Sequence, residues 1–322
     1  MVWCEEDKMM RYRDGLGKPP GDEAGTPREY RGQTFVIAAR CFLVFVSLTA
    51  MFNYDRLQFC INSSYSYLLS TYLFNSVYFE TLFTTFCYTI IMIYPWLVNK
   101  FRCLDSYKII PNVKYQDVSV VEILKMLLIY MTPLMLLDTF MVKKYHGVDP
   151  SVWIDKRSTF IQSTRALPAL PPSAVSIVIQ LAASFIFYDA LFFTIHFTLH
   201  KNFFLYKYIH KQHHEHGVVH SHITNKLTII ERITLVLTAN FALKVFDSHP
   251  FTRMIFIPIF VGILIDNHAG YDMPFGLHRL VPFGLVGGSV KHFAHHQNGN
   301  GNYQPIFTYL DRLLKLYNYQ RL

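Results

Sequence analysis

The sequence predicts an all-α integral membrane protein with about four transmembrane helices, a membrane-dipping helical hairpin and a cytosolic, histidine-rich cap. Of the 322 residues, 52% are hydrophobic and 16% are aromatic. The apolar residues come in long runs and not in short amphipathic periods, which favours helices surrounded by lipid. Fourteen of the fifteen histidines lie between His196 and His296, so the two halves of the chain are expected to differ in role.

Four apolar runs are predicted to cross the membrane. Each is close to the ~20 residues that a helix needs to span the hydrocarbon core, and each contains few charges. Basic residues such as Lys100, Arg102 and Lys201 stand beside these runs, as is typical of membrane ends. The runs cover residues 35–52, 71–98, 120–142 and 174–193.

Two further apolar runs, at residues 227–246 and 251–265, predict a hairpin that enters and leaves the membrane on one side. The basic residues within residues 1–33 favour a flexible cytosolic tail. Four crossings then return the chain to the cytosol just before His196. We therefore divide the chain into this tail, a transmembrane half (34–173) and a catalytic domain (174–322).

Basic residues between positions 143 and 165 oppose this topology, because they would lie on the lumenal side. They are Lys143, Lys144, Lys156, Arg157 and Arg165. The net charge of +8 is otherwise diffuse and forms no concentrated basic face, which argues against nucleic-acid binding. The sequon that begins at Asn62 would also be lumenal, but such triplets are common by chance and its glycosylation stays open.

Eight histidines form three tight clusters, each near an apolar run. Imidazole is the commonest protein ligand of transition metals, and accidental histidines would not group at helical spacings. The clusters therefore predict a multi-metal centre at a membrane face. They read His196-Phe-Thr-Leu-His200, His210-Lys-Gln-His213-His214 and His292-Phe-Ala-His295-His296.

The spacing within the clusters predicts two neighbouring metal ions. Residues four apart share one face of a helix, so His196 and His200 can converge on one centre. Adjacent residues diverge by ~100° around the helix axis, so His213 and His214 can serve different ions. The same reasoning applies to the last cluster. Asp189, seven residues before His196, is expected to accept the free ring N–H of a ligating histidine and to support catalysis.

Other histidines and other metal chemistries fit less well. His216, His220 and His222 are interpreted as solvated loop residues or as residues that support a ligand without binding the metal, and His249 before Pro250 as part of a turn. The stretch after His213 is not a zincin motif, because its second histidine is missing, and no ExxH pair of the soluble di-iron bundles occurs. Iron can change oxidation state and activate O₂, whereas zinc cannot.

From about Ser184 to Leu314 the chain resembles the fatty acid hydroxylase/sterol desaturase superfamily, in particular the cholesterol 25-hydroxylase-like proteins. The resemblance rests on Asp189 before the first cluster, on the two later clusters, on Glu231 and on several loop motifs. These motifs are His249-Pro250, Asp266-Asn-His268-Ala-Gly270-Tyr271-Asp272, Leu277-His278-Arg279-Leu280 and Asn302-Tyr303 with Asp311.

The resemblance implies an endoplasmic-reticulum enzyme with a non-haem di-iron centre that faces the cytosol and uses O₂. It adds His268 and His278 to the eight clustered histidines as metal ligands, and Glu231 to Asp189 as a catalytic residue. Electrons would come from NAD(P)H through a separate reductase or cytochrome b5, because the chain carries no His-Pro-Gly-Gly haem motif.

The function expected from the resemblance is hydroxylation of a lipid C–H bond, with a sterol side chain as the preferred substrate. Three alternatives stay open at this point. The same di-iron machinery could serve a desaturase or a sterol C4-methyl oxidase. The histidines could belong to a membrane metal transporter, although transporters usually place ligands near the bilayer midplane. The chain could also be a binding protein that has lost catalysis.

Overall fold

The computed structural model describes residues 32–102, 104–111, 113, 119–215 and 218–319, so the predicted tail lies almost entirely outside the described residues. The described residues form helices and turns and no β-strand, which confirms the all-α prediction. The helices are α2 (Gln33–Phe52), α3 (Tyr54–Ser70), α4 (Tyr72–Asn75), α5 (Phe79–Phe101), α6 (Val120–Phe140), α7 (Pro150–Ser158), α8 (Ala174–Lys201), α9 (Phe203–Leu205), α10 (Lys211–His214), α11 (Ile229–Val245), α12 (Pro250–Asn267), α13 (Leu277–Leu280), α14 (Gly288–Asn298) and α15 (Tyr309–Tyr319).

Five helices are long and apolar enough to cross a membrane, and they make this a multi-pass membrane protein. Four of them, α2, α5, α6 and α8, correspond to the four predicted spans. The fifth is α12, the second helix of the predicted hairpin, which at 18 residues reaches the length of a span. The predicted span at residues 71–98 begins later than expected, because the extended backbone at Ser76 separates the short α4 from α5.

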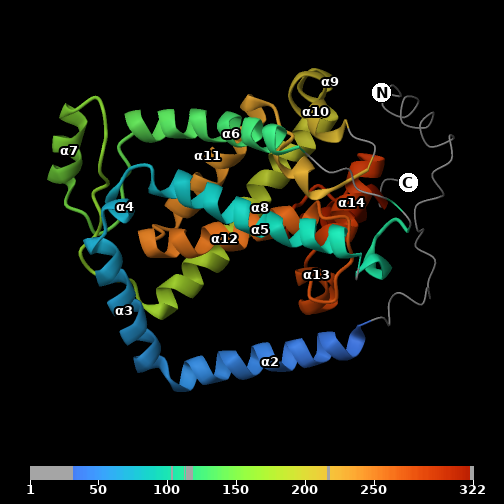
Figure 1. Cartoon of the computed structure of the whole chain (residues 1–322), viewed down its shortest axis with the longest axis horizontal. Helices are drawn as coiled ribbons and strands as arrows, with labels where there is room; N and C mark the ends of the chain where they lie inside the picture. The colour runs from blue at the N-terminus through green and yellow to red at the C-terminus, as the bar shows by residue number, and fades with distance from the viewer. Residues whose placement is uncertain (1–31, 103, 112, 114–118, 216–217, 320–322) are drawn as a thin grey trace.

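Helix α3 was not predicted, because Tyr54–Ser70 is too polar for a span. It buries Ile61 and Tyr65, which lie four residues apart on one face, and the Tyr65 hydroxyl donates to the Pro168 carbonyl at 2.6 Å. Asn62 lies within this helix and is exposed. Figure 1 shows α3 across one end of the long helices, on the same side as α4 and α7.

The opposite end of the bundle carries α10, α13, α14 and the first residues of α2 (Figure 1). The helices α5, α6, α11 and α12 run between the two ends. Helix α12 packs against α5 and α14, and α11 packs against α8 and α6. The two helices of the predicted hairpin, α11 and α12, therefore belong to the body of the bundle. Their termini place residues at the two ends of the bundle.

The central core lies where α8, α11 and α12 meet. Phe185, Tyr188 and Phe256 fill it, and the small side chains of Ala239 and Ala242 let α11 approach α8 closely. Close packing at this crossing fixes the last turns of α8, where the first histidine cluster stands. Lipid-facing helices need no such packing on their outer surface, and many large apolar side chains of the bundle are exposed.

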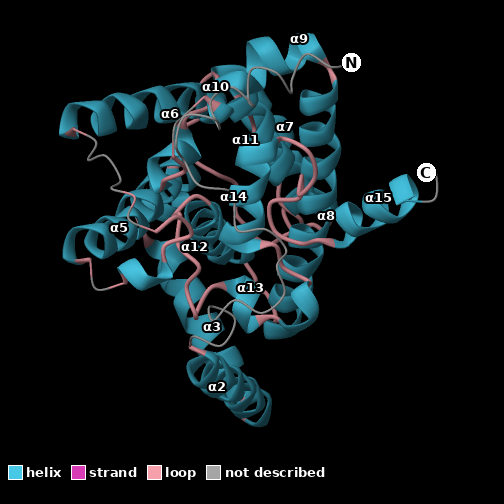
Figure 2. Cartoon of the chain, turned by 90° about the vertical axis from the view of Figure 1, so that its right-hand side faces the viewer, coloured by secondary structure: helices cyan, strands magenta, loops and turns pink. Residues whose placement is uncertain are grey.

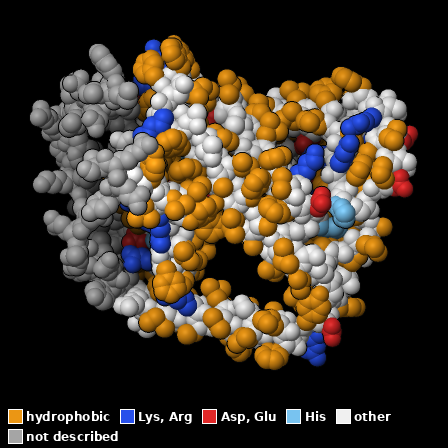
Figure 3. Space-filling view, turned by 180° about the vertical axis from the view of Figure 1, so that it is seen from behind, with side chains coloured by type: hydrophobic (Ala, Val, Ile, Leu, Met, Phe, Trp, Pro, Cys, Tyr) orange, Lys and Arg blue, Asp and Glu red, His pale blue; other side chains and the backbone are white. Residues whose placement is uncertain are grey.

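Helix α2 stands apart from the rest of the bundle (Figure 2), and its apolar side chains are largely exposed. Its connection to the body runs through Arg40, whose guanidinium donates to the carbonyls of Leu280 at 2.9 Å and Arg279 at 2.7 Å. The space-filling view shows an opening between α2 and the other helices (Figure 3). An apolar helix without protein neighbours on most of its surface fits a span in contact with lipid.

Candidate metal centre

Nine histidines from four parts of the chain meet at one end of the bundle and form two groups. The first histidine group consists of His196, His200, His210, His214 and His295. The second histidine group consists of His213, His268, His292 and His296. In each group the candidate ligand atoms all lie within 4.8 Å of one another, and every ring except that of His200 is buried.

Helix α8 provides His196 and His200 from its last two turns, and α14 provides the three histidines of the last cluster. His210 ends a π-helical turn over Tyr206–His210 that leads directly into α10. Such turns widen the helix by one residue and are frequent at functional sites. His268 is the C-terminal cap of α12, so the packing of α12 on α14 carries it into the second group.

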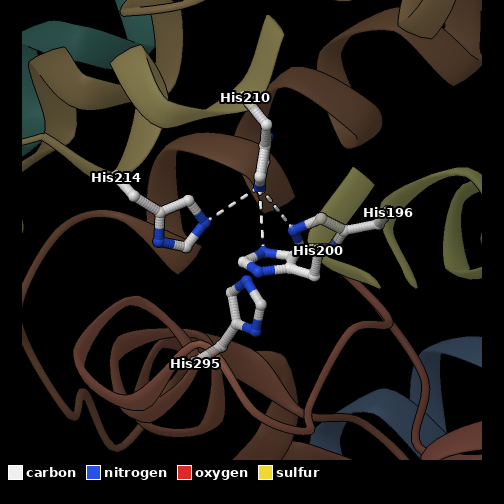
Figure 4. Close-up of side chains that lie close together, drawn as sticks. All are labelled: His196, His200, His210, His214 and His295. Carbon is white, nitrogen blue, oxygen red and sulfur yellow. Dashed lines mark hydrogen bonds between the residues drawn. The ribbon is translucent and has the colours of Figure 1, made fainter. Parts of the chain in front are cut away.

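Three close contacts within the first histidine group meet at one ring nitrogen of His210 (Figure 4). Its Nε2 atom lies 3.1 Å from Nε2 of His196, 3.0 Å from Nε2 of His200 and 2.9 Å from Nε2 of His214. His295 approaches the same point from α14, with ring centroids 4.4 Å from His196 and 4.7 Å from His200. The rings therefore turn their Nε2 edges toward a common centre.

The second histidine group has the same construction. Nε2 of His268 lies 3.0 Å from Nε2 of His292, 3.3 Å from that of His296 and 3.4 Å from that of His213. The Nε2 atoms of His292 and His296 are 3.1 Å apart. The separation of neighbouring ligands at right angles around a metal, with metal–nitrogen bonds of ~2.0–2.1 Å, is about 3 Å. Both groups fit this spacing.

Adjacent histidines divide between the two groups. His213 and His214 point into different groups, and so do His295 and His296. The two groups nevertheless touch, because the rings of His214 and His296 stack with centroids 4.5 Å apart. The ~100° step between neighbouring helical residues thus places two potential metal positions side by side.

Hydrogen bonds on the outer edges of the rings fix which nitrogen faces inward. The Nδ1 atoms of His196, His268 and His295 donate to the backbone carbonyls of Tyr303 at 2.7 Å, Leu264 at 2.8 Å and Gly301 at 2.9 Å. A ring that donates through Nδ1 keeps its lone pair on Nε2. Lone pairs about 3 Å apart repel one another unless a cation lies between them, so the arrangement fits a bound metal.

Burial keeps these rings neutral. It lowers the pKa of His268 to about 4, and burial together with the neighbouring imidazoles lowers the pKa values of His213, His214, His292 and His296 well below the usual range. A metal ligand must be the unprotonated imidazole, and at neutral pH these side chains hold that form without competition from protons.

Glu231 is the acidic partner of the first histidine group. Its Oε1 accepts the Nδ1 proton of His210 at 2.6 Å, and both side chains are buried. The backbone places it there: Glu231 is the third residue of α11, and its N–H donates to the capping side chain of Thr228 at 3.3 Å. Burial raises the pKa of Glu231 to about 8, which disfavours its anion. A metal cation bound at Nε2 of His210 would place positive charge close to Glu231 and would stabilise the anion.

Asp189 does not make the contact expected from the sequence, and this expectation is corrected. Its fully buried carboxylate accepts the backbone N–H of Ile306 at 2.8 Å and the side-chain amide of Gln304. His196 instead donates to the carbonyl of Tyr303. Asp189 thus orders the segment that holds His196, and it acts on the histidine group through the backbone.

His278 is placed in neither histidine group, contrary to the ligand role implied by the resemblance. Its Nε2 lies 2.8 Å from Oδ1 of Asp272, a carboxylate that also accepts from Arg279. Burial opposes the ionisation of Asp272, but the bonds from His278 and Arg279 lower its pKa to about 2. Gly288, with φ +61°, lies so close to the His278 ring that any side chain there would clash. The structure therefore gives His278 a packing role.

The remaining histidines lie outside the two groups, and His216 is not among the described residues. His220 and His222 lie close together, with ring centroids 5.9 Å apart, after α10. His249 caps α12 by accepting the N–H of Phe251 at 3.1 Å, so it forms the predicted turn.

A cavity of about 110 Å³ borders both histidine groups. Its histidine wall is formed by His196, His210, His213, His268 and His292. Its other wall is mainly apolar and includes Tyr188, Phe192, Phe260 and Leu264. An alkyl group fits beside this apolar wall, within reach of the histidines.

Some features of the site could not be found by reading side chains. The carbonyls of Tyr303, Gly301 and Leu264 carry no sequence signal for their role. Asp311 accepts the backbone N–H groups of Tyr303 and Gln304, both at 2.9 Å, and so supports the segment from its other side. For this support, the sequence offered one signal, which was the presence of Asp311 in the motif that begins at Asn302-Tyr303.

Comparison with known proteins identifies the part of the chain that contains this site. Residues 181–315 match the fatty acid hydroxylase family. A cholesterol 25-hydroxylase-like protein of Danio rerio is 35% identical over 142 residues, which is 44% of this chain and 57% of the relative. Cholesterol 25-hydroxylase of Mus musculus is 32% identical over 155 residues, 48% of this chain and 52% of the relative. The human cholesterol 25-hydroxylase is 31% identical over 153 residues, 48% of this chain and 56% of the relative.

The chain spans about half the length of these curated relatives, from 52% to 57%. No solved structure matches it. All members of both histidine groups, together with Asp189 and Glu231, fall inside the segment that matches the family.

Proposed function

We propose that this protein is a membrane-bound non-haem di-iron monooxygenase, because residues 181–315 match the fatty acid hydroxylase family. It hydroxylates a lipid C–H bond with O₂, and a sterol side chain is its preferred substrate. The observation that carries the proposal is the convergence of nine imidazoles into two touching groups of five and four. The relatives whose names specify cholesterol support the sterol class.

The donor set favours iron over zinc in this reaction. Structural zinc sites are closed by four ligands, whereas the first histidine group offers five imidazoles, one more than a closed tetrahedral zinc site takes. Imidazole suits iron, and iron supplies the change of oxidation state that O₂ activation requires. The first histidine group would hold one ion and the second histidine group the other.

The residues around the ions have separate tasks. Glu231 orients His210 and raises its basicity, and the carbonyls of Tyr303, Leu264 and Gly301 orient three further rings. Asp189 and Asp311 hold the segment that carries two of these carbonyls. The apolar wall of the 110 Å³ cavity positions an alkyl carbon beside the histidines and limits the access of water.

The arrangement of the helices is compatible with a cytosolic site, in a membrane that we propose to be that of the endoplasmic reticulum. The first residues of α2 lie on the same side as α14 (Figure 1), so a cytosolic N-terminus would place both histidine groups at the cytosolic face. Electrons from NAD(P)H would then reach the site through a reductase or cytochrome b5 in the same compartment.

The proposal is tested with purified protein in liposomes that contain cholesterol, with a reductase system, O₂ and NADPH. We expect an iron-dependent hydroxysterol, detected by mass spectrometry, and no product from the His295→Ala chain. An iron-loaded protein that yields no oxidised sterol, or one that instead moves metal ions across sealed vesicles, would contradict the proposal. A product with a new double bond would reassign the same site to desaturation.

A further inference from the structure

A second cavity lies at the end of the bundle opposite the histidines. It has a volume of about 490 Å³ and lies among α5, α6, α11 and α12. Its outer end is polar and includes Glu80, Asp138, Lys143, Asn240 and Arg253. Toward the middle of the bundle its walls become apolar. The proposed oxygenase chemistry does not account for this polar end.

The polar end contains more positive than negative charge. Glu80 accepts from Arg253 at 2.9 and 2.8 Å and from Arg165 at 3.3 Å, and Asp138 pairs with Lys143 at 2.7 Å. Arg165 contacts Glu80 without bordering the cavity, so three cations share two carboxylates in a mostly buried network. Each cation has a carboxylate neighbour, but the network as a whole carries one more positive than negative charge. Buried charges are normally balanced, so the network has the capacity to bind an oxygen atom that carries negative charge or accepts hydrogen bonds.

The rim of this cavity adds to the imbalance. The rim carries the basic residues Lys144, Arg157 and Lys244 and the acidic residue Asp247. Most of these cations belong to the basic stretch between positions 143 and 165 that opposed the predicted topology. Because these cations surround a cavity, the basic character of that stretch can be explained by ligand binding and need not indicate on which side of the membrane it lies.

The two cavities adjoin each other. Both are bordered by the same five residues, Thr84, Tyr130, Val236, Phe260 and Val261. Fifteen residues of chain separate Arg253, in the first turn of α12, from His268 at its C-terminal cap. At the rise of an α-helix this corresponds to ~22 Å, which is long enough to hold an extended sterol from its ring hydroxyl to the end of its side chain.

We propose that the two cavities form one substrate channel, and that the substrate is a long amphiphile with its oxygen-bearing head at the cationic end. The larger cavity holds the bulky part of the molecule, and the 110 Å³ cavity admits only the narrow end of an alkyl tail. The oxidised carbon then lies near the tip of the tail, far from the head. The positive balance of the polar end favours an acidic head over a neutral hydroxyl. This inference rests on the proposed function.

The channel is tested by blocking it at the shared wall. Val236→Trp places a large ring where the cavities adjoin, and Val245→Trp makes the same exchange on α11 at an exposed position outside both cavities. We expect Val236→Trp to lose at least tenfold in kcat/KM for cholesterol and in equilibrium binding of labelled cholesterol, with unchanged iron content. Val245→Trp should match the wild type. Equal binding and turnover in both variants would overturn the channel.

The head-binding end is tested with three sterols that share one side chain and carry a 3-sulfate, a 3-hydroxyl or no group at C3. We expect the wild type to bind them in that order, and Lys244→Glu to weaken binding of the sulfate about tenfold while binding of the deoxysterol stays the same. Lys315→Glu, an exposed exchange on α15, is the matched control. Equal binding of all three sterols, or equal losses for all three in Lys244→Glu, would refute the head subsite.

A membrane phosphate could occupy the same cations, and the vesicle composition distinguishes this source. If the Lys244→Glu effect follows the fraction of anionic phospholipid and not the sterol head, the cations bind lipid head groups and the substrate inference fails. The failure of the proposed function looks different. An iron-loaded wild type would then bind sterol without producing any hydroxysterol.

Discussion

Exchange of Glu231 for glutamine tests the supporting shell of the metal centre. The carboxylate accepts the Nδ1 proton of His210 at 2.6 Å, and the exposed fractions are 4% for Glu231 and 1% for His210. Glutamine has the same size and can still accept this proton, but it carries no negative charge. The variant therefore removes the charge-assisted part of the bond and leaves the packing in place.

The magnitude follows from the central position of His210. Its Nε2 lies within 3.1 Å of three other Nε2 atoms, so a change in its orientation or basicity affects the whole first histidine group. Loss of such an outer partner typically costs tenfold to hundredfold in metal affinity or activity, about 1.4 to 2.7 kcal/mol. We expect Glu231→Gln to lie in this range. Glu231→Ala should be worse, because it leaves the Nδ1 proton buried without an acceptor.

Iron retention during dialysis against a graded chelator series, measured by plasma mass spectrometry, gives the affinity directly. Glu122→Gln is the matched control, because Glu122 holds the same third position after a capping residue in α6 but is exposed. Circular dichroism shows whether each variant is folded. If folded Glu231→Gln retains iron and turnover like the wild type, the argument that this carboxylate tunes His210 is refuted.

The remaining predictions concern other parts of the site. His213→Ala and His295→Ala should each abolish turnover and lower the iron content without affecting membrane insertion; full activity in either variant would contradict the assignment of its histidine group. Asp189→Asn should retain some iron and lose most activity, because the segment at Gln304 is repositioned; an unchanged rate would limit Asp189 to packing. His278→Ala should keep the wild-type iron content, because His278 lies in neither group, and a loss of one iron per chain would restore it as a ligand. The apoprotein should lose thermal stability between pH 7 and pH 5, because the pKa of His268 falls to about 4 on folding and the unfolded chain takes up the proton; a melting temperature that rises on acidification would contradict this.

The local part of the site was predictable because it depends on helix geometry alone. Spacings of three and four residues bring histidines to one face, and adjacent histidines diverge, so the division of His213 from His214 follows from the sequence. The four long apolar runs predicted four of the five candidate spans for a similar reason. Each of these inferences needs only contiguous residues.

The parts that failed depend on contacts between distant segments. Asp189 was assigned to a histidine ring because it lies two turns away on the same helix, but residues more than a hundred positions later occupy its carboxylate. Helix α3 forms although Tyr54–Ser70 is polar, because Tyr65 packs against a distant loop. The role of the basic stretch that includes Lys143 and Arg165 also required the fold, since α6 provides Asp138 for Lys143 and α5 provides Glu80 for Arg165.

The most direct test of the metal centre is the number and kind of iron ions in the purified protein. Mössbauer spectroscopy of protein enriched in ⁵⁷Fe, combined with metal analysis, measures both. The account predicts two irons per chain, each with nitrogen-rich coordination. A single iron per chain, iron in an oxygen-rich environment or a preference for zinc under iron-replete conditions would contradict it.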